Sequence, residues 1–325
     1  MIWQQKRVSL ILILLVAVVG SGTLWLFFQR PHFSVVPGTD VIVFTRDDEL
    51  GAQLYAATVD GTQQARITEN IERIAWWLPL PNPFGSVTFN THPSHIQNSN
   101  DVVFMSDLGV GQSLYRVGID GRNQRPLAAR VGFNIPINAF PSPNLSWIAL
   151  PNPDGTLHVV RLDGSGDTCV TCTIADRVSA PAWSPTSQQL AFSASVDGVD
   201  EVYVVDVDGT NLRRLTPAHV KAFEPAWSSD GSRIAFVSSF QNTARLFVMN
   251  SDGTQLRQVT RDPIDGSVPM SERFPVWSSD DTQIAFIASP NNQADIFVTN
   301  LATGTVRRVT TLGKVSDPTW VRVQP

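Results

Sequence analysis

The sequence predicts an all-β fold, a six-bladed β-propeller, and two observations carry the prediction. First, one pattern of residues recurs in three stretches of equal length: Ser179 to Thr216, Phe223 to Thr260 and Arg273 to Thr310. Second, each stretch contains apolar, β-branched runs separated by turn signals such as Asp-Gly, which indicates short strands joined by tight turns. Self-similarity at a period of roughly 40 to 45 residues is typical of repeats that each supply one four-stranded unit.

Each repeat has the same internal order. In the central repeat, Pro225 to Ser228 form a Pro-x-Trp-Ser opening, Ile234 to Phe236 an apolar triplet, and Arg257 to Thr260 the closing segment. One unit alone would leave both faces of its sheet apolar, so its tryptophan is buried only if a neighbouring unit stacks against it. A closed ring of blades provides every unit with neighbours. We therefore expect four equivalent core tryptophans between blades: Trp183, Trp227, Trp277 and Trp320.

This pattern resembles the WD40-like (PD40) repeats of the TolB family, which also occur in the propeller domains of prolyl-oligopeptidase-type enzymes. The resemblance covers roughly Ser179 to Trp320 and is looser before it. It implies a propeller that acts as a scaffold in the cell envelope and meets protein or peptide partners at its face. The related peptidases carry a separate hydrolase domain, and no residues remain here to build one.

The chain begins with a candidate transmembrane helix, predicted as residues 1–30. Val8 to Phe28 contain no charged residue and are long enough to span a bilayer. The segment is either an uncleaved signal anchor or a signal peptide cleaved near Gly20 to Gly22, and the apolar run beyond that point favours the anchor. Lys6 and Arg7 then stay in the cytoplasm. This predicts a single-pass protein of the cell membrane with an extracytoplasmic propeller; the alternative is secretion after cleavage.

A linker of residues 31–39 leads into the predicted propeller of residues 40–325. The first repeat lacks an opening strand, because Val41 to Phe44 correspond to the second strand of the later repeats. The missing motif lies at the other end of the chain, where Ser316 to Trp320 repeat the opening. We expect this C-terminal strand to complete the N-terminal blade, which closes the ring and removes free sheet edges. Counting the closing segments gives six blades.

The second and third repeats are degenerate. In the second, Ala75-Trp76-Trp77 is interpreted as the opening, so that Leu78 to Asn100 is an insertion. The insertion is interpreted either as an ordered surface loop or as a partner-binding loop, since long loops on rigid scaffolds often carry function. In the third repeat, Phe140 is expected at the position of the tryptophan.

Charge argues against nucleic acid as a partner. The 325 residues carry a formal charge of −5, and beyond residue 30 there are 21 basic and 29 acidic side chains, a formal charge of −8. An acidic domain repels a phosphate backbone.

No sequence motif predicts catalysis, a metal or a cofactor. His92 and His95 form the one close histidine pair, but two histidines in a Pro-rich segment do not make a metal site. The alternative function is a propeller polysaccharide lyase or another carbohydrate-processing enzyme, because oligogalacturonate lyases, which this chain resembles in fold, use a histidine-held metal. A convergent histidine cluster would distinguish that enzyme from a binding scaffold.

Two further pairs of side chains invite a chemical interpretation. Cys169 and Cys172 are expected to form a structural disulfide, as exported cysteines usually do. Residues three apart in a strand lie about 10 Å apart, and a disulfide spans at most about 7 Å, so a bonded pair requires a turn. Asp206 and Asp208 suit calcium by type, but Asp208 belongs to an Asp-Gly hairpin turn and no EF-hand spacing follows.

The predicted ligand site is one mouth of the central channel. The first strand of a blade is innermost, so the residues before each Pro-x-Trp motif should surround the mouth. These residues vary where the scaffold motif repeats, and their acids, arginines and aromatic ring suit a peptide or a cationic group. The alternative is a solvated channel lining without a partner. The predicted ligand-binding residues are Glu72, Arg73, Glu224, Arg273, Phe274 and Asp317.

Overall fold

The computed structural model describes residues 33–325, apart from 34–35, 49–50, 69–72, 76–77, 80–87, 108–112, 128–138, 175–176, 241–242 and 261–270. The predicted membrane anchor of residues 1–30 lies outside the described residues, and so do Glu72, Trp76 and Trp77. In the part of the chain that is described, no helix is long and apolar enough to cross a membrane.

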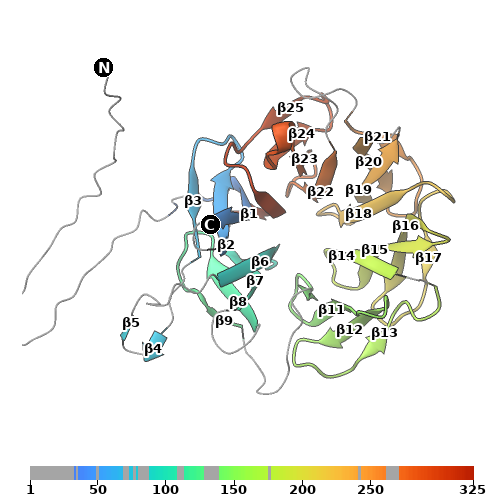
Figure 1. Cartoon of the computed structure of the whole chain (residues 1–325), viewed down its shortest axis with the longest axis horizontal. Coiled ribbons are helices and arrows are strands. Elements are labelled where there is room, and N and C mark those ends of the chain that lie inside the picture. The colour runs from blue at the N-terminus through green and yellow to red at the C-terminus, as the bar shows by residue number, and fades with distance from the viewer. Residues whose placement is uncertain are drawn as a thin grey trace, which may run out of the picture. The chain divides into compact units, whose positions relative to one another are not determined.

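Six antiparallel blades of four strands surround a central opening, which confirms the predicted fold (Figure 1). The first blade contains β26 (Val315–Arg322), β1 (Asp40–Asp48), β2 (Gly51–Thr58) and β3 (Gln64–Arg66). The second contains β6 (Thr88–His95), β7 (Asp101–Ser106), β8 (Ser113–Gly118) and β9 (Arg125–Pro126). The third contains β10 (Phe140–Pro141), β11 (Trp147–Pro151), β12 (Leu157–Arg161) and β13 (Thr168–Cys169).

The remaining three blades are the strict repeats. The fourth contains β14 (Arg177–Trp183), β15 (Gln189–Val196), β16 (Val199–Asp206) and β17 (Arg213–Arg214). The fifth contains β18 (Ala222–Trp227), β19 (Arg233–Phe240), β20 (Thr243–Asn250) and β21 (Arg257–Gln258). The sixth contains β22 (Glu272–Trp277), β23 (Gln283–Ala288), β24 (Asp295–Asn300) and β25 (Val306–Arg308), with the 3₁₀ turn η2 (Pro290–Asn292) before β24.

The C-terminal strand closes the ring as predicted. β26 pairs antiparallel with β1, with Val321 opposite Val41, both fully buried. Beyond the strand, Val323 donates its N–H to the carbonyl of Thr39 and accepts from Gly38, both at 2.9 Å. The inner strand of the first blade therefore comes from the far end of the chain.

The second blade corrects the sequence interpretation. Its opening strand is β6, which lies inside the expected insertion, whereas Ala75 belongs to a separate two-stranded sheet of β4 (Arg73–Ala75) and β5 (Leu78–Pro79). In β6, His95 pairs with Val102 as Trp227 pairs with Ile234, so His95 occupies the tryptophan position. β2 also pairs in parallel with β6 and joins the first two blades.

The third blade requires a correction of one residue. Phe140 lies opposite Ala149 and Pro141 lies opposite Ile148. Comparison with the fifth blade, where Trp227 faces Ile234, places Pro141 at the tryptophan position and Phe140 one residue before it. Proline fits there because β10 is only two residues long and needs few ladder hydrogen bonds.

The core lies between the blades. Trp277 and Trp320 are buried, and Trp183 and Trp227 pack at the margins of inter-blade clusters. Trp277 donates its indole N–H to the carbonyl of Ala226 in the preceding blade at 3.0 Å, and Trp183 makes the corresponding bond to Phe140 at 2.8 Å. The tryptophans of the fourth and sixth blades thus couple each of these two blades to the one before it.

Hydrogen bonds explain the two most regular polar features of the repeat. The hydroxyl of each closing threonine accepts the backbone N–H of the residue fourteen positions earlier, in the third strand, at 2.8–3.2 Å. These buried threonines are Thr68, Thr171, Thr216, Thr260 and Thr310. In the Asp-Gly turns, an aspartate oxygen accepts the N–H and the hydroxyl two residues on, as in Asp252 with Thr254. Both features are therefore scaffold.

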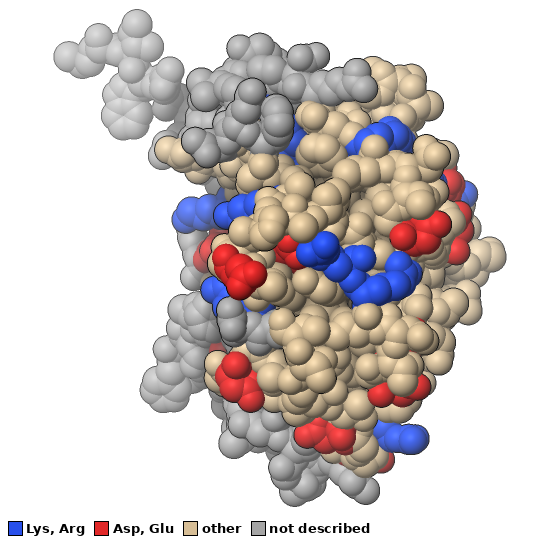
Figure 2. Space-filling view, turned by 90° about the vertical axis from the view of Figure 1, so that its right-hand side faces the viewer, with Lys and Arg blue, Asp and Glu red and all other residues tan. Residues whose placement is uncertain are grey.

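The outer strands are short and charged. β17, β21 and β25 contain two or three residues each, and the arginines at their exposed positions include Arg213, Arg257 and Arg307. Figure 2 shows basic side chains gathered across the middle of one side of the ring, with acidic side chains around them. Short, charged edge strands resist pairing with strands of other molecules.

Candidate functional site

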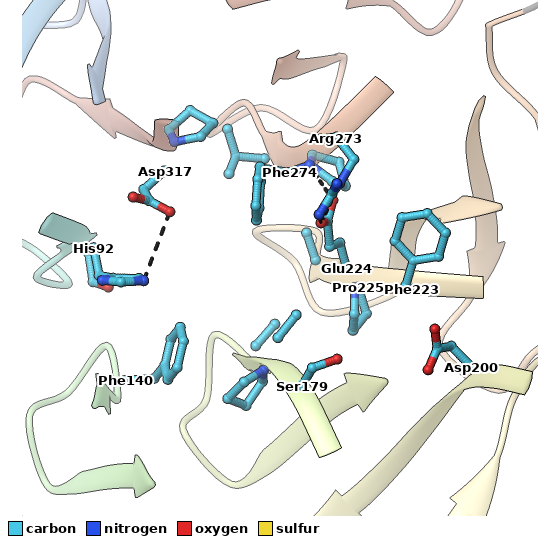
Figure 3. Close-up of a pocket in the computed structure, with 18 of the residues that line it drawn as sticks. His92, Phe140, Ser179, Asp200, Phe223, Glu224, Pro225, Arg273, Phe274 and Asp317 are labelled. Carbon is cyan, nitrogen blue, oxygen red and sulfur yellow. Dashed lines mark hydrogen bonds and ion pairs between the residues drawn. The ribbon is translucent and has the colours of Figure 1, made fainter. Parts of the chain in front are cut away.

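A pocket of about 630 Å³ lies at the mouth of the central opening. The inner strands β6, β14, β18, β22 and β26 line it together with Phe140 of β10, so every blade contributes (Figure 3). We call it the channel-mouth pocket and define it by His92, Phe140, Glu224, Phe274 and Asp317.

A recurrent backbone feature brings these side chains to the mouth. The residue before the opening proline has a positive φ of 47–54° in five blades, and this position is occupied by His92, Ala180, Glu224, Phe274 and Asp317. In all five strands the pairing with the second strand shifts register across this residue, as between Phe223 and Ala226. Such a bulge re-aims a side chain. Left-handed φ in non-glycine residues is strained, and strain of this kind gathers at functional sites.

Glu224 is the buried anchor of one wall. Its side chain is 7% exposed; Oε1 accepts a hydrogen bond from Nε of Arg273 at 2.6 Å, and Oε2 accepts the backbone N–H of Phe274 at 2.7 Å. The Arg273 guanidinium lies 5.6 Å from the centre of the Phe223 ring and 5.1 Å from that of Phe274. Charge-assisted bonds and cation–π contacts together fix this wall across two blades.

Asp317 lies on the opposite side of the pocket. Its Oδ1 is 4.0 Å from Nε2 of His92, and its Oδ2 accepts a hydrogen bond from the Ser316 hydroxyl at 2.9 Å. The His92 ring also meets the Phe140 ring edge to face, with centroids 5.5 Å apart. Asp317 therefore holds a less enclosed carboxylate than Glu224, with about a fifth of its side chain exposed.

The remaining lining combines apolar surface with separated charges. Proline rings follow each of the five mouth residues, and Phe223 and Phe274 add aromatic faces. Asp200 and Lys221 stand at one margin, and the Lys221 ammonium lies 5.8 Å from the centre of the Phe223 ring. A concave, mostly apolar pocket with a few fixed polar groups is the usual form of a ligand site.

Four of the six predicted ligand-binding residues line the pocket: Glu224, Arg273, Phe274 and Asp317. Glu72 lies outside the described residues. Arg73 lies in β4, in the small sheet with β5, and is not the counterpart of the mouth residues. That counterpart is His92, which sequence reasoning missed because the second opening motif was assigned to Trp76-Trp77. The signal that could have found it is Pro93, which follows His92 as Pro225 follows Glu224.

The cysteine pair and the aspartate pair both have structural roles. Cys169 and Cys172 form a disulfide whose Cα atoms are 5.8 Å apart, and residues 172–174 form a turn. Asp208 accepts hydrogen bonds from the hydroxyl and the backbone N–H of Thr210, which lower the pKa of its carboxyl. Asp206 accepts bonds from Gln189 and Asn211. Hydrogen bonds within the blade therefore account for both aspartates.

The fold is similar to TolB from Acinetobacter baumannii (TM-score 0.63, 14% identity, 87% of this chain and 66% of that one). It is also similar to a chain of a nidogen/laminin complex (TM-score 0.60, 11% identity, 88% of this chain and 100% of that one). A third similar structure is a puromycin-hydrolyzing peptidase from Mycobacterium tuberculosis (TM-score 0.51, 17% identity, 86% of this chain and 53% of that one). The chain thus spans just under two thirds of the first of these structures and about half of the peptidase.

No curated protein matches this sequence. The family model described as the TolB beta propeller domain, PD40, matches residues 139–322, which is more than half of the chain. The sequence repeats, the closed ring of six blades and this match agree. The protein belongs to the TolB β-propeller domain family.

Proposed function

We propose that this protein is a non-catalytic binding scaffold that holds a protein or peptide partner at the channel-mouth pocket. The observation that carries the proposal is the convergence of one variable residue from the inner strand of each of five blades on one pocket, at a position where the backbone is strained. The propeller fold needs the proline and the bulge at this position, but it does not need the side chains of Phe274 or Asp317.

The chemistry of the pocket favours a peptide segment. The volume of about 630 Å³ falls within the range of ligand pockets and is large enough for a few side chains. Phe140, Phe223 and Phe274 offer apolar and aromatic surface, and Asp317 offers a carboxylate for a cationic group. The Glu224–Arg273 pair is already formed, so binding loses little conformational entropy at that wall.

The arrangement of the ionisable groups supports binding over catalysis. Glu224 is bonded to Arg273 and to a backbone N–H, and His92 faces a carboxylate and an aromatic ring. Catalysis of acyl or glycosyl transfer requires a nucleophile or a second acid aligned with such a base. Among the other described histidines, His95 contacts the carbonyl of Ser99 and His158 contacts Asp167.

The proposal includes an extracytoplasmic location. Its support is the uncharged run from Val8 to Phe28 behind Lys6 and Arg7. A single-pass anchor would tether the propeller to the membrane and present it to partners in the cell envelope. Finding the full-length protein in the membrane fraction with its first residues intact would support the anchor, and a mature N-terminus near Ser21 would contradict it.

The binding site is tested with Asp317→Lys and Phe274→Ala in the full-length protein. Each is used to capture partners from the envelope fraction, and the captured proteins are identified by mass spectrometry. We expect a partner that the wild type retains and that both variants lose at least tenfold. Glu224 is not a suitable target, because its replacement would leave Arg273 without its carboxylate and disturb the fold.

The matched control is Asp47→Lys, which reverses one exposed charge outside the channel-mouth pocket. It should leave capture unchanged. If Asp317→Lys and Phe274→Ala, shown to be folded by circular dichroism, retain the same partner as the wild type, the pocket is not the binding site.

A further inference from the structure

The disulfide lies beside a histidine that the sequence does not bring near it. His158 of β12 pairs in register with Cys169 of β13, so the two side chains lie next to each other on the third blade. One ring nitrogen of His158 and the sulfur atoms of Cys169 and Cys172 all lie within 4.8 Å of one another. Among the described residues, these three form a cluster of possible metal ligands.

We propose that the third blade carries a redox-gated site for a thiophilic divalent cation such as Zn²⁺. In the oxidised protein the two sulfurs are bonded to each other and cannot act as thiolate ligands. A dithiol reductant would open the bond: two electrons and two protons pass to Cys169 and Cys172, and the reductant becomes a cyclic disulfide. Metal binding then displaces the two thiol protons and gives a Cys₂His ligand set.

The geometry of the turn suits this metal. Tetrahedral zinc has Zn–S distances of about 2.3 Å, which places its two sulfurs about 3.8 Å apart. The Cα atoms of Cys169 and Cys172 are 5.8 Å apart, so rotation of the two side chains is enough to open the sulfurs to that spacing. His158 supplies the third ligand, and solvent can supply the fourth.

The turn is held by contacts other than the disulfide. Between the cysteines, Val170 is 3% exposed and Thr171 is 1% exposed. Val170 donates its N–H to the carbonyl of Leu157, and the Thr171 hydroxyl accepts the Leu157 N–H at 2.8 Å. Reduction therefore leaves the backbone positions of the two cysteines in place, and Cys172 is exposed to a reductant and to a cation.

A carboxylate holds the ring of His158. Its Nδ1 lies 2.7 Å from Oδ1 of Asp167. A carboxylate bound to one ring nitrogen fixes the ring and leaves the lone pair of the neutral imidazole on the other, which is the usual environment of a metal-binding histidine. Asp167 is exposed and acts here as a positioning residue.

The test uses purified full-length protein with Co²⁺ as a spectroscopic substitute for Zn²⁺. A phosphine opens the disulfide, taking oxygen from water while the two protons of that water go to the thiols, and a thiol assay should count two new thiols. The reduced protein should then bind one Co²⁺ per chain with a thiolate-to-cobalt absorption band, and Zn²⁺ should abolish the band. The oxidised protein should show no such band.

Variants separate this site from a structural disulfide. His158→Ala should weaken Co²⁺ binding by the reduced protein at least tenfold, and Asp167→Asn by about tenfold. His219→Ala, which replaces an exposed histidine on the linker between β17 and β18, should change nothing. A reduced protein without a cobalt–thiolate band, or one in which His158→Ala binds as the wild type does, would overturn the proposal.

Folding of the reduced form is checked with the double variant Cys169→Ser/Cys172→Ser. It should keep the circular dichroism spectrum of the wild type and form no cobalt–thiolate band. If the double variant or the reduced protein loses its β-sheet spectrum, the turn depends on the disulfide and the site does not exist as proposed.

Discussion

Aspartates in the tight turns make the stability of the fold depend on pH in the acid range. Hydrogen bonds from Ser232 and Ser228 lower the pKa of Asp230 to about 2, and those from Thr58 and Thr62 do the same for Asp60. A carboxyl with a depressed pKa in the folded state contributes stability above its unfolded pKa of about 4, and that contribution disappears as the pH falls through about 2. Several turns share this feature, so their effects act in the same pH range.

We expect the melting temperature of the wild type to fall more steeply between pH 4 and pH 2 than that of Asp230→Asn, because the amide cannot be protonated in this range. At pH 7 the variant should be less stable than the wild type, since it loses the charge-assisted bonds. Thermal unfolding followed by circular dichroism at several pH values measures both effects. Parallel curves for the two proteins would contradict this origin of the acid sensitivity.

The tryptophan at the end of the inner strand contributes to the free energy of unfolding through its burial. Trp277 is 5% exposed and donates to Ala226, whereas Trp227 is only partly buried. We expect Trp277→Ala to lower the free energy of unfolding by about 3–5 kcal/mol through lost burial and a cavity. Trp227→Ala should cost less. Urea titration of both variants checks the order, and equal losses would contradict the dependence on burial.

One blade also supplies a hydrogen-bonding side chain that its neighbour lacks. In the fourth and sixth blades a buried acid, Glu201 or Asp295, directly precedes the residue whose N–H binds the closing threonine, and the fifth blade has Arg245 at this position. Glu272 of β22 supplies the missing carboxylate from the next blade and accepts bonds from Leu246 N–H at 2.8 Å and from the Thr260 hydroxyl. Burial raises the pKa of Glu272, although Arg245 lies 3.7 Å away.

Particular residues show how far the sequence predicts these elements. Pro-x-Trp and Asp-Gly are local signals, so the three strict repeats and the closing strand were predicted correctly. The sequence prediction placed the opening strand of the second blade too early, because His95 replaces the tryptophan in β6 and Trp76-Trp77 matches the motif by chance. The mouth residues could be predicted from the proline that follows them. The Glu224–Arg273 pair and the approach of His158 to the cysteines depend on the packing of blades and the pairing of strands, which no local pattern encodes.

The ring as a whole depends on one strand from the far end of the chain. β26 contributes buried Trp320, Val321 and Val315 and pairs with β1 over most of its length, and Gln324 exchanges hydrogen bonds with Asn100 of the second blade. Every other blade is built from consecutive strands. Closure therefore ties together segments that the chain places at its two ends, which makes β26 the point where the whole structure can be opened.

We expect deletion of residues 315–325 to leave a three-stranded first blade with Val41 and Val43 on an open edge, and so to cause a large loss of thermal stability together with aggregation. Because the missing element is a strand, a synthetic peptide of residues 315–325 should pair with β1 and partly restore the melting temperature. Deletion of Gln324 and Pro325 alone, which keeps β26, is the matched control and should have a small effect. Differential scanning calorimetry and size-exclusion chromatography measure these outcomes; a truncated protein that melts at the wild-type temperature as a monomer would mean that the ring does not need β26 for its stability.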